Sequence, residues 1–308
     1  MGIKIDNISH CLGSEIKLIS DFVPYNKVAN ITKRTGIKKI YRVSKKEDLI
    51  TLCYKACKKI ISKKNNHHID GLILLTQSPK YNIPSNSFVL HKMLNLKKEC
   101  MVFDINLGCS GYVYALSLAN AFFKSKQLKK ILIITGDTYS KYCKKLNVKI
   151  IFSDCATATI VSAANNKKIE FQFYSDGAKS EYLKQRSSNY QKNINENSLE
   201  MNGVNVFNFS LEHVPMQIKK LISINKINIK KIDYLLLHQA SKVVNSNIER
   251  KINIDSKKIL RNYSKFGNTV SSSIPLLISQ FKKKLKRKKL LLCGFGVGLS
   301  VGVCYIET

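Results

Sequence analysis

Residues 100–127, CMVFDINLGCSGYVYALSLANAFFKSKQ, contain the junction that decides the fold. The mostly apolar run 100–108 predicts a buried strand, and apolar side chains recurring at spacings of three and four over 111–127 predict a helix. Between them, two glycines flank Cys109 and indicate a tight turn. A strand that leads directly into a helix is the basic unit of an α/β protein.

The same alternation continues on both sides of this junction. Short apolar runs predict strands, and longer stretches with helical periodicity predict helices. Strands are expected at 71–78, 100–108, 129–138, 156–165 and 232–241, and helices at 85–96, 111–127, 204–224, 242–252 and, after a turn, within 267–285. The polar stretch 175–200 is expected to be an exposed loop. This order predicts an α/β fold with a mostly parallel sheet.

One uncharged segment, 290–306, has the sequence LLLCGFGVGLSVGVCYI and follows a lysine-rich run. It is shorter than the ~20 residues that a membrane-spanning helix needs. Its glycines suit two buried strands joined by a tight turn. We therefore expect a strand pair here, and no membrane span.

The chain is strongly basic, with 52 Lys and Arg against 20 Asp and Glu and a formal net charge of +32. Such an excess attracts polyanions, including nucleic acid, anionic lipid and acidic carrier proteins. The lysines are scattered, however, and no zinc-finger, homeodomain or RNA-recognition signature is present. We expect no dedicated nucleic-acid partner and interpret the charge mainly as compositional bias.

The nine cysteines have irregular spacing and form no CxxC pair, which fits reduced thiols better than a disulfide framework or a zinc site. The N-terminal sequence MGIKIDNISH lacks the apolar run of a secretory signal. Together these features predict a cytoplasmic protein without a metal site.

Three reactive polar residues lie where an apolar strand turns toward a helix: Cys109, His238 and Asn268. Ligands of open α/β sheets gather at such strand ends. The helix N-terminus after Cys109 is expected to lower the thiol pKa and favour the thiolate. Each residue also has a structural interpretation: a buried thiol, a core histidine, or a Gly-Asn turn. Taken one at a time, the three residues leave both interpretations open.

Taken together, they lie in segments that resemble the ketoacyl-acyl carrier protein synthase III family of the thiolase superfamily. The resemblance covers nearly the whole chain and keeps the order Cys109, His238, Asn268. It rests on RTGIKK (34–39), IPSNS (83–87), FDINLGCSGYVYAL (103–116), SDGAKSEYL (175–183), NGVNVF (202–207), LLLHQAS (235–241), KFGNTVSSSIP (265–275) and GFGVGLSVG (294–302).

This resemblance implies a thiolase-like fold, in which two similar α/β halves pack as a five-layered αβαβα domain. The N-terminal half would span 1–166 and carry the nucleophile; the C-terminal half would span 167–308 and carry the histidine and asparagine. It also implies a homodimer, with Ile83 lining the acyl pocket of the partner subunit.

The implied reaction is a decarboxylative Claisen condensation that starts fatty-acid chains. Cys109 would take an acyl group from a thioester. His238 and Asn268 would donate hydrogen bonds to the enolate formed by decarboxylation of a malonyl-type thioester on acyl carrier protein. No cofactor is implied, because coenzyme A and carrier-bound phosphopantetheine thioesters are substrates. The basic surface would then attract the acidic carrier protein.

The resemblance also implies two sets of contact residues. The backbone N–H of Cys109 and one from the turn Gly296, Val297 and Gly298 would hold the oxyanion. Substrate-binding roles would fall to Arg34, Ile83, Phe207 and Ser241. The last position is asparagine in the family, and Val297 and Cys155 stand where the family has glycines, so the acyl donor is left open.

Three functions therefore remain. The first is a ketoacyl synthase III that starts fatty-acid synthesis, with an acyl-CoA or acyl-carrier donor. The second is a divergent relative that transfers or condenses acyl groups in surface-glycan or secondary-metabolite synthesis. The third is a basic binding protein without catalysis on the same scaffold. A cysteine protease uses the same three residue types, but its histidine acts as a base rather than as a donor.

Overall fold

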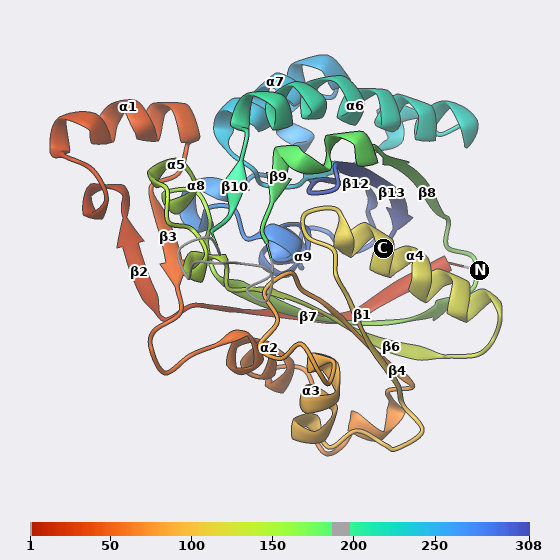
Figure 1. Ribbon diagram of the computed structural model, residues 1–308. Helices are drawn as coiled ribbons and strands as arrows, with labels where there is room; N and C mark the ends of the chain where they lie inside the picture. The colour runs from red at the N-terminus through yellow and green to blue at the C-terminus, as the bar shows by residue number, and fades with distance from the viewer. Residues whose placement is uncertain (1, 187–197) are drawn as a thin grey trace.

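The computed structural model describes residues 2–186 and 198–308, which form two β-sheets stacked with helices between and outside them (Figure 1). The first sheet has the strand order β1-β7-β6-β4-β5. Its strands are β1 (Gly2–Leu12), β4 (Gly71–Leu75), β5 (Met101–Ile105), β6 (Lys130–Asp137) and β7 (Cys155–Ala164). All of them come from the N-terminal side of residue 166.

The second sheet has the order β11-β12-β13-β8 and comes from the C-terminal side of the chain. Its strands are β8 (Ile169–Ser175), β11 (Tyr234–Leu237), β12 (Lys289–Gly296) and β13 (Ser300–Glu307). Strands β12 and β13 pair antiparallel from Lys289 with Glu307 to Gly296 with Ser300. The expected strand pair within 290–306 is thus confirmed.

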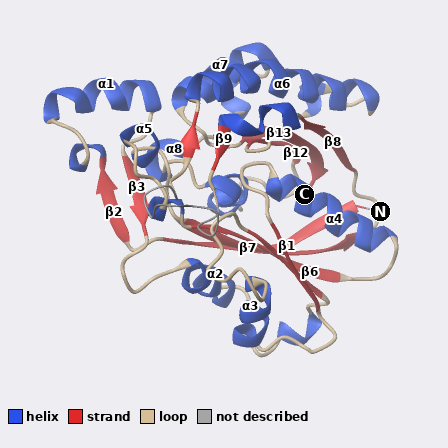
Figure 2. Cartoon of the chain, in the orientation of Figure 1, coloured by secondary structure: helices blue, strands red, loops and turns tan. Residues whose placement is uncertain are grey.

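Helices fill three layers around the two sheets (Figures 1 and 2). Outside the first sheet lie α2 (Leu49–Lys58) and α3 (Asn86–Leu94); between the sheets lie α4 (Gly111–Lys124) and α9 (Ser273–Gln280); outside the second sheet lie α6 (Gly203–Ile224) and α7 (Lys242–Ile252). The result is the expected order of layers, αβαβα. The buried middle layer explains why α4 is apolar on most of its surface, with eight buried residues among its fourteen.

The remaining elements belong to neither the two sheets nor their helix layers, and α1 among them extends away from the sheets at one side (Figure 2). They are β2 (Glu15–Leu18), α1 (Tyr25–Thr35), β3 (Lys39–Arg42), α5 (Leu146–Lys149), β9 (Leu183–Lys184), β10 (Glu200–Met201) and α8 (Tyr263–Phe266), with short 3-10 turns between them. None of the eleven residues of α1 is buried.

The expectation of a mostly parallel sheet is wrong, because both sheets are mixed. Strand β4 is parallel to β5 and β6, whereas β7 is antiparallel to both β6 and β1. Parallel neighbours need a crossover across the sheet face, which α3 and α4 supply. The connection from β6 to β7 instead returns at the same end of the sheet and contains no long helix.

The expectation of an exposed loop over 175–200 is also wrong for its described parts. A 3-10 turn, Gly177–Tyr182, leads into β9, which pairs with β10. Leu183 and Leu199 are buried. Residues 187–197 of this stretch lie outside the described part of the chain.

Among the described helices, none is both long enough and apolar enough to span a membrane. The apolar stretch near the C-terminus is a β-hairpin of the second sheet, so its hydrophobicity is explained by burial inside the protein.

Candidate active site

Cys109 lies at the turn between β5 and the N-terminus of α4, beside the last residues of β12. A Cβ atom at Gly296 would lie 3.1 Å from the Cys109 Sγ, and one at Gly294 would lie 2.6 Å from the Cys109 carbonyl oxygen. These two glycines of the second sheet therefore let the strand pass directly under the cysteine. The nucleophile candidate from the first half of the chain is packed against the second half.

The environment of Cys109 keeps its thiol protonated. Burial, with a smaller contribution from the nearby Asp137 carboxyl, raises the pKa of this thiol to about 12, although the backbone N–H groups of Cys109 and Val297 act to lower it. The expectation that the helix N-terminus favours a thiolate is therefore wrong for the free protein, because desolvation outweighs these N–H groups. The thiol must lose its proton during the reaction itself.

The turn after β12 supplies one of those N–H groups through Val297. Gly296 and Gly298 have φ angles of 150° and 137°, which favour glycine, whereas Val297 is not among the residues with positive φ. A β-branched residue therefore fits the middle of the turn, and its N–H still points to the Cys109 Sγ. Its place beside the sulfur fits the predicted oxyanion role, which stays a prediction.

His238 follows β11 and is almost completely buried. Burial lowers the pKa of its ring to about 3, so the imidazole is neutral at physiological pH. The ring packs edge-on against Phe295 of β12, with centroids 5.3 Å apart, and its Nδ1 has no hydrogen-bond partner among the described residues. A neutral imidazole can donate one hydrogen bond without bringing a charge.

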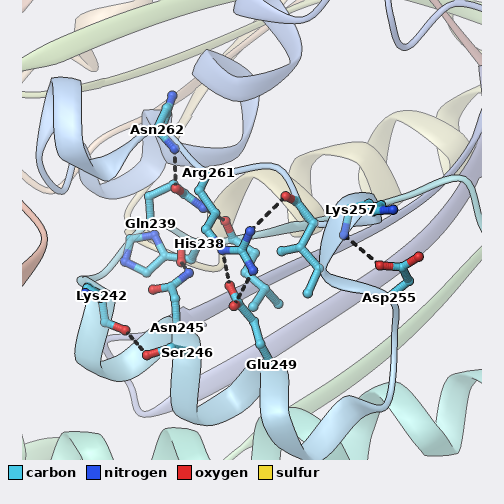
Figure 3. A network of polar contacts seen from close by, with 12 residues as sticks. His238, Gln239, Lys242, Asn245, Ser246, Glu249, Asp255, Lys257, Arg261 and Asn262 are labelled. Atoms are coloured by element: carbon cyan, nitrogen blue, oxygen red, sulfur yellow. Dashed lines mark hydrogen bonds and ion pairs between the residues drawn. The ribbon is translucent and has the colours of Figure 1, made fainter.

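A polar network fixes the backbone around His238 (Figure 3). Asn245 Nδ2 donates to the His238 carbonyl oxygen at 2.9 Å, and the His238 N–H donates to the Cys293 carbonyl oxygen at 2.8 Å. Gln239 Oε1 accepts the backbone N–H of Asn262 at 2.7 Å. The histidine is therefore held from three sides, by β12, α7 and the segment before α8.

Asn268 lies in the turn after α8 with its amide oriented by the backbone. Its Oδ1 accepts the N–H of Val270 at 2.9 Å, which leaves the amide nitrogen as the free end of the side chain. The main chain of Asn268 is fixed by its N–H donating to Ile151 and by the N–H of Ser153 donating to its carbonyl oxygen, at 2.9 and 2.8 Å. The amide nitrogen has no acceptor among the described residues, so it is available as a donor.

Contacts bring the loops that carry these three residues together around Cys109. Val270 lies against Gly108, because a Cβ on that glycine would meet its Cγ1 at 3.3 Å. Phe295 contacts His238 on one side and precedes Gly296, which lies under the sulfur. The three candidates thus occupy one region between the two sheets, as their strand-end positions predict.

Asp137, at the end of β6, is a buried residue of this region that the sequence analysis did not identify. Its carboxylate accepts the backbone N–H of Gln77 at 2.8 Å and both the hydroxyl and the N–H of Ser271, at 2.5 and 3.3 Å. Burial raises the pKa of this carboxyl to about 7. The signal was present, because Asp137 is a polar residue ending an apolar strand, like the three that were identified.

A cavity of about 430 Å³ reaches Gln77, which lies against Gly108, and Val297, whose N–H points to the Cys109 Sγ. It is lined by Gln77, Pro79, Asn82, Asn106, Tyr139, Tyr142, Ser180, Leu183, Lys184, Gln185, Arg186, Leu199, Val297 and Gly298. The volume lies in the range of small-molecule pockets. Cys109, His238 and Asn268 are not among these lining residues, but the contacts of Gln77 and Val297 with the Cys109 loop fit a chamber for the group that the sulfur carries.

The four predicted substrate-binding residues lie outside the lining of this cavity. Arg34 is exposed on α1, Ile83 is 88% exposed, and Phe207 is half-buried at the start of α6. Ser241 is buried as the N-cap of α7, where its hydroxyl accepts the N–H of Val244. Their roles toward substrate stay predictions.

Comparisons with known proteins point in one direction. The family model described as 3-Oxoacyl-[acyl-carrier-protein (ACP)] synthase III matches residues 103–177, and the model of its C-terminal part matches residues 222–308. The beta-ketoacyl-[acyl-carrier-protein] synthase III of Clostridium tetani is 32% identical over 300 residues, which cover 90% of this chain and 89% of the relative. That of Streptococcus pneumoniae is 29% identical over 316 residues and covers 97% of each chain.

Solved structures agree with the sequence comparisons. A 3-oxoacyl-(acyl-carrier-protein) synthase III matches with a TM-score of 0.92 and 29% identity over the whole of both chains. The 3-oxoacyl-(acyl-carrier-protein) synthase of Burkholderia xenovorans matches with a TM-score of 0.94 and 28% identity, over 100% of this chain and 94% of that one. The five-layered thiolase-like fold is thereby confirmed.

Proposed function

Because this chain belongs to the 3-oxoacyl-[acyl-carrier-protein] synthase III family, we propose that Cys109, His238 and Asn268 carry out the two half-reactions of that enzyme. Members of the family are acyltransferases of fatty-acid synthesis, and this chain is one of them. Its overall reaction is the decarboxylative condensation of an acyl thioester with a malonyl thioester on acyl carrier protein.

In the first half-reaction the Cys109 sulfur attacks the carbonyl carbon of the acyl donor. A C–S bond forms to Cys109, the C–S bond to the donor breaks, and the thiol proton passes to the departing thiolate. The N–H groups of Cys109 and Val297, which already lie beside the sulfur, hold the oxyanion of the tetrahedral intermediate. Burial of the thiol suits this sequence, because the free enzyme carries no exposed thiolate that reacts without substrate.

In the second half-reaction a malonyl thioester loses CO2 and leaves an enolate. The neutral ring of His238 and the amide nitrogen of Asn268 donate hydrogen bonds to the enolate oxygen. The enolate carbon then attacks the acyl carbon on Cys109, and the cysteine leaves as thiolate and regains a proton. The low pKa of His238 and the fixed Oδ1 of Asn268 support donor roles for both groups.

The observation that carries this proposal is the fixed orientation of Asn268. Since its oxygen is held by the Val270 N–H, only the amide nitrogen faces outward, and an asparagine cannot ionise. A cysteine protease instead needs its histidine to accept the thiol proton, and a ring whose pKa burial lowers to about 3 is a poor base.

The acceptor thioester is carried on acyl carrier protein, and we propose that the donor is an acyl-CoA or acyl-carrier thioester. Acyl carrier proteins are acidic, so the net charge of +32 speeds their encounter with this protein. No cofactor enters either half-reaction, because the thioester bond supplies the activation.

We also propose that the protein works as a homodimer through the open edge of the first sheet. Strand β5 ends the strand order and has no neighbour on its outer side among the described strands. Large apolar side chains are exposed in the same part of the chain: Ile83 is 88%, Phe88 53% and Met101 41% exposed. An open edge with exposed apolar groups is suited to pairing with a second copy.

Intact mass spectrometry of the purified protein after incubation with acyl-CoA donors tests the assignment. The wild type should gain the mass of one acyl group, and Cys109→Ser should gain none. Cys143→Ser is the matched control, because Cys143 is buried in the same hydrophobic cluster and should leave acylation intact. Normal acylation of Cys109→Ser would remove the basis of the proposal.

A further inference from the structure

Several side chains that line the cavity near the Cys109 loop can form hydrogen bonds. Gln77 lies against this loop: a Cβ on Gly108, the residue before the cysteine, would lie 2.3 Å from the Gln77 Oε1. That oxygen accepts the hydroxyl of Tyr139 at 2.9 Å. Asn82 and Asn106 also line the cavity.

The bond from Tyr139 also orients the amide of Gln77. Because Oε1 is occupied by a buried tyrosine, the amide nitrogen is the end that is left for other partners. It donates to no acceptor among the described residues, although Gln77 lines the cavity. A donor without a protein acceptor thus belongs to a side chain that lies against the residue before the nucleophile.

Apolar side chains from the C-terminal half of the chain also line the cavity. They are Leu183, Leu199 and Val297. Two cationic residues, Lys184 and Arg186, lie in the lining as well, and the ammonium of Lys184 is paired with Glu181. The chamber therefore offers hydrocarbon contact together with the neutral hydrogen-bonding groups of Gln77, Asn82 and Asn106.

We propose that the acyl group carried by Cys109 bears a neutral polar substituent, such as a hydroxyl, that accepts a hydrogen bond from the Gln77 amide nitrogen. This inference rests on the proposed function of Cys109. A plain alkyl chain in the same place strips water from the amide and returns no hydrogen bond. Sites built to bond a substrate hydroxyl discriminate against the analogue that lacks it.

A competition between two donors of equal carbon number tests the inference directly. The wild-type protein is incubated with an equimolar mixture of 3-hydroxybutyryl-CoA and butyryl-CoA, and intact mass spectrometry gives the initial ratio of the two acyl-enzymes. We expect the hydroxyacyl form to exceed the butyryl form by about tenfold or more. An equal ratio, or an excess of the butyryl form, overturns the inference while leaving acyl transfer by Cys109 intact.

The outcome in which neither acyl group, nor acetyl, is transferred to the protein from its coenzyme A or its acyl-carrier thioester overturns the proposed function together with this inference. The Gln77→Leu variant tests whether Gln77 causes the preference for the hydroxyacyl donor. The substitution should lower the hydroxybutyryl-to-butyryl ratio at least tenfold, while the butyryl enzyme should still form. Gln127→Leu is the matched control, since Gln127 is exposed beyond the far end of α4. If the Gln77→Leu variant folds and its hydroxybutyryl-to-butyryl ratio is unchanged, Gln77 does not bind the acyl substituent. If the variant does not fold, the competition on the wild-type protein alone tests the inference.

Discussion

The carboxylate of Asp137 accepts the hydroxyl of Ser271 at 2.5 Å across 134 positions of sequence. Asp137 ends β6 in the first sheet, and Ser271 belongs to the turn that begins with Asn268. The same carboxylate accepts the N–H of Gln77, which lines the cavity. One buried acid therefore ties together the loop that carries Asn268, the Gln77 segment that lines the cavity and the end of β6.

Replacing Asp137 with asparagine should change how stability depends on pH. The ordinary carboxyl pKa of 3.8 is raised to about 7 by burial, so between these values the folded protein holds a proton that the unfolded chain has lost. The contribution of Asp137 to the free energy of unfolding therefore falls as pH rises from about 4 to about 7 and is constant above it. Urea unfolding at each pH gives the free energy of unfolding of the wild type and of Asp137→Asn. The wild-type value minus the variant value should fall by up to about 4 kcal/mol between pH 4 and pH 7.

Asp70→Asn is the control for that series. Partial burial raises the pKa of Asp70, but hydrogen bonds from Lys97 and from the backbone of Lys129 and Lys130 outweigh it and hold the pKa below 3.8. Its stabilising contribution is complete above pH 4, so the corresponding difference should be flat between pH 4 and 7. A flat Asp137 difference would contradict the raised pKa.

The thiol of Cys109 should react with alkylating reagents more slowly than an exposed cysteine in a short peptide. The pH dependence of the two alkylation rates should also differ. A thiol pKa raised to about 12 by burial leaves little thiolate at pH 7. The alkylation rate by iodoacetamide, followed on the Cys109 peptide by mass spectrometry, should rise about tenfold per pH unit up to pH 9.5. A short peptide with one exposed cysteine, whose thiol pKa is about 8.5, should level off near that pH in the same solutions. A plateau for Cys109 below pH 9 would show that the thiolate is stabilised in the free protein.

Asn268→Asp separates the two ends of the asparagine amide. The aspartate keeps an oxygen for the Val270 N–H, and thus the turn, but replaces the donor nitrogen with a second oxygen that repels the enolate. We expect condensation to fall by about 10²–10³-fold, as for loss of one oxyanion donor, while acylation of Cys109 persists. The measurements are product formation from malonyl-carrier and intact mass without it. His238→Ala should give the same split, and loss of acylation with normal malonyl decarboxylation would reverse the roles.

Ile83→Lys should weaken self-association. Its side chain is 88% exposed next to Asn82, which lines the cavity, so a charge there adds a desolvation cost only if a second copy covers it. Light scattering should give a dimer for the wild type and a larger monomer fraction for the variant. Lys124→Glu, at the end of α4, is a control for altered charge alone. A monomeric wild type would exclude the proposed dimer.

The parts of the fold that could be predicted are those whose pattern is local. The apolar runs that became β4, β5, β6 and β11 are short, continuous and bounded by polar residues, and α4 and α6 keep a helical period over fourteen and 22 residues. By contrast, no strand was expected before residue 71. Strand β1 mixes polar and apolar residues, and it is defined by its antiparallel pairing with β7, which lies more than 140 positions away.

The candidate site shows the same limit. Cys109, His238 and Asn268 could be found because each ends a recognisable strand or turn. The protonation of Cys109 could not, because burial comes from packing against β12, and only the folded chain places Gly296 under the sulfur. The polarity of the acyl chamber was hidden for a similar reason: Gln77 and Tyr139 are 62 positions apart and meet only through the parallel pairing of β4 and β6.

The passage of β12 under Cys109 makes catalysis a reporter of how the two sheets are seated on one another. The nucleophile belongs to the helix layer that the first sheet supports, while Gly296 and Val297 belong to the second sheet. Any loosening of the contact between the sheets separates the thiol from its N–H donor even if each sheet keeps its own hydrogen bonds. We therefore expect the enzymatic rate to fall on heating at a lower temperature than the circular dichroism signal.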